Sequence, residues 1–130
     1  MSQILFIVWT EKNNLGIPII DEQHRGIIST INSLYHSIQM GDYEDTVKPL
    51  LVALEHYTKI HFRTEKDLML KAEYPNFNNH IALHNKLFEK TKTFSANANV
   101  LPDATEVLRF LKKWWLTHIN KEDRHFSFWV

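Results

Sequence analysis

A stripe of helical period between residues 50 and 68 is the feature that most constrains the fold. Its members recur three and four positions apart, so they share one face of a helix. The stripe consists of Leu50, Leu51, Leu54, Thr58, His61, Phe62, Glu65 and Leu68. Such a face packs against a core, yet this one includes a histidine and a glutamate. We therefore expect a buried helix whose core contains polar chemistry.

Length and glycine content narrow the fold class. With 130 residues, of which 44% are apolar, the chain suits one domain with one core, residues 1–130. Only three glycines occur, and the dipeptides typical of hairpin turns are absent from the sequence. The sequence therefore predicts an all-α protein.

Charge and cysteine content exclude several classes of function. Fifteen basic residues balance fifteen acidic ones, so nucleic acid and membrane surfaces are not expected partners. No cysteine is present, which leaves imidazole and carboxylate groups for metal or catalytic chemistry, and histidine occurs eight times. The opening apolar run is too short for a signal peptide or a membrane span, so we expect a soluble, cytoplasmic protein.

Four amphipathic segments are expected to form the helices. The first begins near Asp21, a candidate N-cap, and stops at residues 41–43; the second covers about 44–72 and the third about 77–96. The fourth opens at Asp103, which has capping-box spacing to Glu106. Short connections predict an antiparallel up-down-up-down four-helix bundle over residues 21–126, with residues 1–20 as an extended N-terminal arm.

The inward faces of all four segments collect metal-binding residue types. These residues are His24, His61, Glu65, His80, His84 and His118. One such histidine alone is usually a satisfied core residue. Together they would leave many buried donors and acceptors to satisfy, at about 1–3 kcal/mol for each orphaned group. A metal centre satisfies them all at once.

The number and type of donors indicate which metal centre. A structural zinc takes four ligands and a catalytic zinc three, so five histidines with carboxylates point to two ions. Ferritin-like di-iron sites use two Glu-x-x-His motifs. This sequence has one, Glu122 to His125. The site is therefore rich in nitrogen, which favours a transition metal over magnesium or calcium.

Four segments resemble the signature segments of the hemerythrin family, in order and with matching spacing. They are "GIPIIDEQH" (16–24), "HFRTE" (61–65), "YPNFNNHIALH" (74–84) and "WWLTHINKED" (114–123). The resemblance extends from Trp9 to about Phe126 and fills every ligand position of the family. It implies reversible binding of dioxygen at a non-haem di-iron centre.

The resemblance also implies a role for each ligand residue. One iron would be held by His80, His84 and His118, and the other by His24 and His61. Glu65 and Asp123 would bridge the irons, together with an oxo or hydroxo group from solvent. One position on the iron with two histidines would stay open for dioxygen or a small anion such as azide. The walls around it are expected from Ile28, Trp114 and Ile119.

Two assignments in the fourth segment are less clear: which carboxylate faces the site, and where Trp115 lies. On an ideal helix Glu122, four positions after His118, would face the site better than Asp123. The family pattern favours Asp123, so we expect the helix to loosen there. Trp115 stands where many members carry a smaller aliphatic residue; it could narrow the oxygen pocket, but we prefer the interpretation that it covers the bundle surface.

Three further aromatic or basic residues have open roles. His125 lies seven residues after His118, so it could act behind the ligands. For Tyr57 and Tyr74 we prefer packing in the core, with the hydroxyl at its edge, to a redox role.

Oxygen binding without catalysis is the preferred function, because no catalytic base near the open position is evident. The alternatives are a di-iron enzyme of the peroxidase or nitric-oxide reductase type, and an oxygen or redox sensor. A monomer is favoured.

Overall fold

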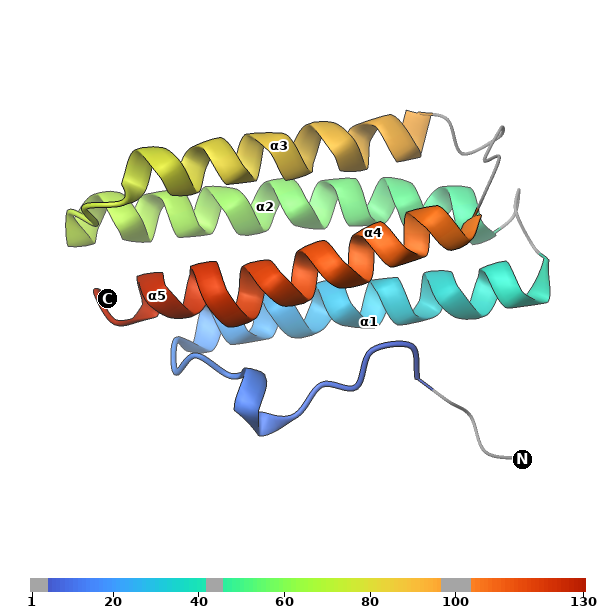
Figure 1. The fold of residues 1–130 in the computed structure, drawn as a ribbon, viewed down its shortest axis with the longest axis horizontal. Helices are drawn as coiled ribbons and strands as arrows, with labels where there is room; N and C mark the ends of the chain where they lie inside the picture. Colours follow the sequence, from blue (N-terminus) through green and yellow to red (C-terminus); the bar gives the residue numbers. More distant parts are fainter. Residues whose placement is uncertain (1–4, 42–45, 97–103) are drawn as a thin grey trace.

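The computed structural model describes residues 5–41, 46–96 and 104–130. Four long helices form an antiparallel bundle (Figure 1): α1 (Pro18–Met40), α2 (Lys48–Ala72), α3 (Phe77–Ala96) and α4 (Ala104–Thr117). A short 3-10 helix, η1 (Glu11–Asn13), precedes them, and the π-helix η4 (His118–Asp123) and α5 (Arg124–Ser127) continue α4. The described residues include no strand. The predicted all-α bundle is confirmed.

The first helix begins earlier than predicted. Asp21 is not its N-cap; Ile17 is, and Pro18 occupies the first turn. Proline suits that place because its fixed φ is helical and its missing N–H would have no partner there. The Asp21 carboxylate instead accepts hydrogen bonds from the backbone N–H groups of Leu15, at 2.7 Å, and Gly16, at 3.1 Å. Asp21 thus fixes the turn that joins the arm to the bundle.

The described part of the arm, residues 5–17, runs beside α1 (Figure 1). The Asn32 side chain pairs with the backbone of Ile7 in both directions, at 2.7 and 2.8 Å. Further along, the Arg124 guanidinium donates to the carbonyl of Lys12 at 2.6 Å. The arm is therefore held to both the first helix and the last.

The ends of the other helices agree with the sequence where the structure describes them. The third helix has the predicted bounds. The second has Pro49 in its first turn and ends at Ala72, and its C-cap, Glu73, has a left-handed φ of 53°. The predicted start of this helix near Glu44, and the cap at Asp103, lie outside the described residues.

Two apolar clusters form the core, one on each side of a polar layer. The larger cluster fills the half of the bundle where α1 ends and α2 begins, and includes Ile31, Leu34, Leu51, Leu54, Val107 and Leu111. The smaller consists of Met69, Tyr74 and Phe126. Along α2 the buried residues between the two clusters include His61 and Glu65. None of the described helices has the length and hydropathy needed to cross a membrane.

Candidate metal centre

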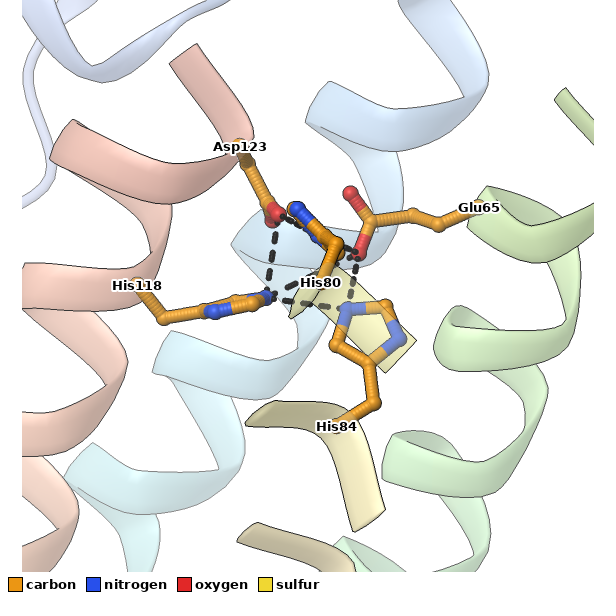
Figure 2. A group of neighbouring side chains, drawn as sticks. All are labelled: Glu65, His80, His84, His118 and Asp123. Atoms are coloured by element: carbon orange, nitrogen blue, oxygen red, sulfur yellow. Dashed lines mark hydrogen bonds and ion pairs between the residues drawn. The ribbon is translucent and has the colours of Figure 1, made fainter. Parts of the chain in front are cut away.

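Seven side chains converge in the polar layer, and Figure 2 shows five of them facing one another. The seven are His24 on α1, His61 and Glu65 on α2, His80 and His84 on α3, and His118 and Asp123 at the two ends of η4. Each is at most 2% exposed. The structure thus brings together every residue that the sequence proposed as a ligand.

The seven residues form two overlapping groups, each with ligand atoms within 4.8 Å of one another. One group is Glu65, His80, His84, His118 and Asp123. The other is His24, His61, Glu65 and Asp123. Both carboxylates are common to the two groups, and the imidazoles divide three to two. This arrangement suits two neighbouring cations that share Glu65 and Asp123.

Asp123 presents one oxygen to each group. Its Oδ2 lies 2.7 Å from Nε2 of His24 and 3.5 Å from Nε2 of His61. Its Oδ1 lies 3.0 Å from Nε2 of His80 and 3.0 Å from Nε2 of His118. The carboxylate therefore stands between the two sets of imidazoles, as a bridging ligand must.

Glu65 reaches both groups through its Oε1 atom. This oxygen lies 3.2 Å from Nε2 of His61 and 3.0 Å from Nε2 of His84. Neither oxygen of Glu65 has a hydrogen-bond partner among the described residues, although both are buried. A buried carboxylate without hydrogen bonds is costly, so a bound cation is the natural partner of these oxygens.

The π-helix explains why Asp123 reaches the site. In π-helical geometry residues five apart lie on one face, because the hydrogen bonds run from i to i+5. The segment His118–Asp123 has this geometry, so its first and last residues both point into the core. Glu122, which an ideal α-helix would direct toward the site, is only half-buried. The predicted loosening after His118 is confirmed.

The imidazole nitrogens crowd together in a way that favours metal binding. Nε2 of His24 lies 3.1 Å from Nε2 of His61, and Nε2 of His84 lies 3.2 Å from Nε2 of His118. In each neutral pair only one nitrogen can donate to the other, and the Nε2 atom of His80 has no hydrogen-bond partner. Cations between the rings would accept all these lone pairs, so the donor set fits transition-metal ions.

The two carboxylates stay ionised despite their burial. Burial and the nearby Asp123 both act to raise the pKa of Glu65, yet His61 and His118 hold it well below its usual range. Burial likewise opposes ionisation of Asp123, and His118, His24 and His61 hold its pKa well below the usual range. Two negative charges are thus fixed in the dry core, where they attract cations.

The pKa values of the histidines differ according to how strongly these carboxylates act on each ring. Burial lowers the pKa of His61 and His80, but Glu65 and Asp123 outweigh it and raise both to about 9. The same carboxylates raise the pKa of His118 against burial. Burial dominates at His84, whose pKa falls to about 4, and at His24, whose pKa is also lowered. Without metal, protons would supply the positive charge that cations otherwise bring.

A chain of hydrogen bonds behind His61 orients its ring. The Thr64 hydroxyl donates to the carbonyl of Ile60 at 3.1 Å and accepts from the amide nitrogen of Gln23 at 3.0 Å. The amide oxygen of Gln23 therefore faces Nδ1 of His61, at 2.9 Å. This fixes the proton on Nδ1 and leaves the Nε2 lone pair for the site.

Gln23 and Thr64 are not among the site residues predicted from the sequence. Each stands directly before a ligand in the sequence, Gln23 before His24 and Thr64 before Glu65. A polar residue directly before a ligand, off the apolar stripe, is the sequence signal that indicates such a supporting role.

Of the three predicted wall residues, two are buried and one is at a cavity. Ile28 and Ile119 lie in the larger apolar cluster. Trp114 is half-buried and stacks on the His118 ring with centroids 4.8 Å apart. It lines a cavity of about 350 Å³ together with Leu83 and Phe110. The centre is thus separated from solvent mostly by apolar groups.

The prediction that Trp115 covers the bundle surface is wrong. Its side chain is fully buried, and its ring centroid lies 5.9 Å from that of His61 and 6.0 Å from that of His118. It also packs against Phe62 at 5.8 Å. A large indole can be buried here because it spans the boundary between the larger apolar cluster and the polar layer. Trp115 therefore lies directly against the site.

Known proteins agree with this arrangement. The family model described as "Hemerythrin HHE cation binding domain" matches residues 15–127. The chain is 30% identical to bacteriohemerythrin of Stenotrophomonas maltophilia, over 93% of this chain and 79% of that protein. It is 32% identical to bacteriohemerythrin of Methylococcus capsulatus, over 91% and 92%.

A solved structure titled as wild-type hemerythrin superposes with a TM-score of 0.86 at 26% identity, over 94% of this chain and 95% of that chain. The family match, the relatives and the shared fold all lead to one assignment. The chain belongs to the hemerythrin family, and it is a di-iron oxygen-binding protein.

Proposed function

We propose that this protein binds dioxygen reversibly at two irons held by the seven clustered residues. His80, His84 and His118 would hold one iron, His24 and His61 the other, and Glu65 and Asp123 both. The observation that carries this proposal is the sharing of both carboxylates between a group of three imidazoles and a group of two. When bound, the iron pair supplies coordination and reversible electron transfer to dioxygen.

The unequal number of imidazoles supports a binding site on one side only. Two bridging carboxylates give equal numbers of donors to each ion. The ion beside His24 and His61 therefore has one protein donor fewer than its neighbour. An external ligand, dioxygen or a small anion, would take that free position.

Exclusion of water supports a carrier role. The arm brings Trp9 within 6.3 Å of the His24 ring, measured between centroids. On the inner side, Ile28, Ile119 and Trp115 are each at most 2% exposed. Such walls admit a small apolar gas more easily than water or protons, which promote irreversible oxidation of the irons. We infer that these walls determine how long the oxygenated state survives.

Ligand binding, with one wall variant and one matched surface variant, tests the function. The reduced protein should take up one dioxygen for each iron pair and release it under vacuum, and the oxidised protein should bind one azide. Ile119→Gln should speed autoxidation at unchanged iron content, whereas the surface change Ile60→Gln should not. A protein that keeps two irons but binds neither dioxygen nor azide would contradict the proposal.

The finer parts of the role remain predictions of the same proposal. We infer carriage, storage or delivery of oxygen rather than its catalytic consumption, because the relatives are named as hemerythrins. A monomer and a cytoplasmic location are the matching expectations. Steady oxygen consumption by the reduced protein with an added electron donor would favour an enzyme instead.

A further inference from the structure

Tyr74 occupies a special position between the metal centre and the surface. It follows the end of α2, where its backbone N–H donates to the carbonyl of Met69 at 3.0 Å and Glu73 adopts a left-handed φ of 53°. This helix ending fixes the tyrosine in the smaller apolar cluster, where it is 4% exposed. Its ring meets the His80 ring edge-on, with centroids 6.1 Å apart.

The Tyr74 hydroxyl has a partner that reaches the surface. A hydrogen bond of 2.6 Å joins it to Nδ1 of His125, which is an exposed residue of α5. The Trp129 ring, half exposed at the C-terminal end, also lies beside Tyr74, at 6.2 Å between centroids. A path of adjoining rings therefore leads from the surface through Tyr74 to His80.

We propose that Tyr74, paired with His125, is a one-electron relay between the surface and the iron pair, and that it supports reduction of hydrogen peroxide. The relay rests on the proposed di-iron centre. A phenol loses an electron readily only if its proton can leave at the same time. The 2.6 Å hydrogen bond to an imidazole provides that acceptor.

The reaction balances with a hydrogen donor of the phenol or ascorbate class. Hydrogen peroxide takes two electrons and two protons to become two waters. In each of two passes Tyr74 gives one electron towards His80 and its phenolic proton moves to Nδ1 of His125. A donor at the surface then returns one electron to Tyr74 while His125 returns the proton, which restores both residues. The donor releases its own proton to solvent, and the two protons taken up by the peroxide come from solvent. Overall, two donor molecules each lose one hydrogen atom for every peroxide reduced.

Other aromatic residues are less suited to this role. Trp115 is close to His61, but its Nε1–H is buried without a hydrogen-bond partner among the described residues, so its proton has no exit. Tyr57 is 50% exposed, contrary to its expected core position, and is therefore a suitable control. Trp114 stacks on His118 and is the competing route that the experiment must separate.

Electron paramagnetic resonance after addition of hydrogen peroxide to the iron-loaded diferric protein tests the relay. We expect a tyrosyl radical in the parent protein and in Tyr57→Phe, and its loss in Tyr74→Phe. Spin trapping followed by peptide mass spectrometry should place the adduct on Tyr74. Peroxide reduction with ascorbate should fall at least tenfold in Tyr74→Phe, and His125→Leu should lower the radical yield.

Iron content and azide binding separate the relay from the di-iron function itself. Both should be unchanged in Tyr74→Phe, because the substitution keeps the packed ring. A radical that persists in Tyr74→Phe, an adduct on Trp114, or no radical in an iron-loaded parent would overturn the relay while leaving oxygen binding intact. A parent protein that holds no iron pair would overturn both.

Discussion

The two halves of this bundle are stabilised in different ways. In the half where α1 ends, buried aliphatic residues such as Leu34 and Leu51 fill the core. In the half where α1 begins, the centre of the core is five imidazoles and two carboxylates. Figure 2 shows His80, His84 and His118 with both carboxylates. The first half gains stability by removing apolar surface from water. The second places charges in a dry interior, which costs free energy unless cations balance them.

The contrast places the candidate metal centre in one half of the core only. Several polar atoms that face the site have no hydrogen-bond partner among the described residues: both carboxylate oxygens of Glu65, Nε2 of His80 and Oδ1 of Asp123. The smaller apolar cluster closes the bundle beyond the site. The polar layer is thus held between two apolar ones and depends on ligand bonds for its own stability.

Iron removal should have the largest effect on stability, and it tests the difference between the two halves most directly. Metal binding is coupled to folding, so the apoprotein should melt at a lower temperature than the iron-loaded protein. Amide hydrogen exchange should show where: amides around His61 and Glu65 should lose protection, whereas those around Leu34 and Leu51 keep most of theirs. Equal protection with and without iron would mean that the polar half is stable on its own.

Replacing one carboxylate should remove the irons without removing the fold. Asp123→Ala deletes the oxygens that face both imidazole groups, so we expect loss of both irons by elemental analysis. Glu122→Ala is the matched control, because this neighbour belongs to neither group of clustered ligands, and it should keep two irons. If the control lost iron and Asp123→Ala did not, α-helical rather than π-helical geometry would describe the site.

A cavity in the apolar half should show the opposite pattern. Leu51→Ala deletes a fully buried side chain and should lower the free energy of unfolding by about 2–5 kcal/mol. Iron content should not change, because the site lies in the other half. Val52→Ala, at a 38% exposed neighbouring position, should cost much less in the same denaturation experiment.

The smallest expected effect is at the hydrogen bond behind His61. Gln23→Leu removes the acceptor for Nδ1 and should weaken iron binding by about 10- to 100-fold, as changes behind metal ligands commonly do. Competition with a chelator measures this. Gln39→Leu, at an exposed position of the same helix, should leave the affinity unchanged.

Periodicity predicted most of the fold because each helix buries one face. The stripe that contains Leu54, His61 and Glu65 is buried as expected. Errors occurred at helix ends, where local contacts decide. Asp21 resembles an N-cap in the sequence, but its carboxylate accepts from Leu15 and Gly16 instead. Such a choice depends on the path of the arm, which periodicity does not encode.

The site was predictable in its residue types but not in its finer geometry. Buried histidines at helical spacing predicted a metal centre without any structure. Predicting that Asp123 reaches the site required the family pattern. The local sequence alone does not distinguish a π-helix from an α-helix. Trp115 was misplaced because its environment depends on how closely α2 and α4 approach. Side-chain networks such as Gln23 with Thr64 likewise join residues far apart in the sequence.

Anomalous X-ray diffraction at the iron edge, on crystals of the iron-loaded protein, tests the central claim most directly. The account predicts two iron peaks for each chain, one beside His80, His84 and His118 and one beside His24 and His61. Both peaks should contact Glu65 and Asp123. A single peak, or a second iron bound by residues other than these, would contradict a di-iron centre that shares its two carboxylates.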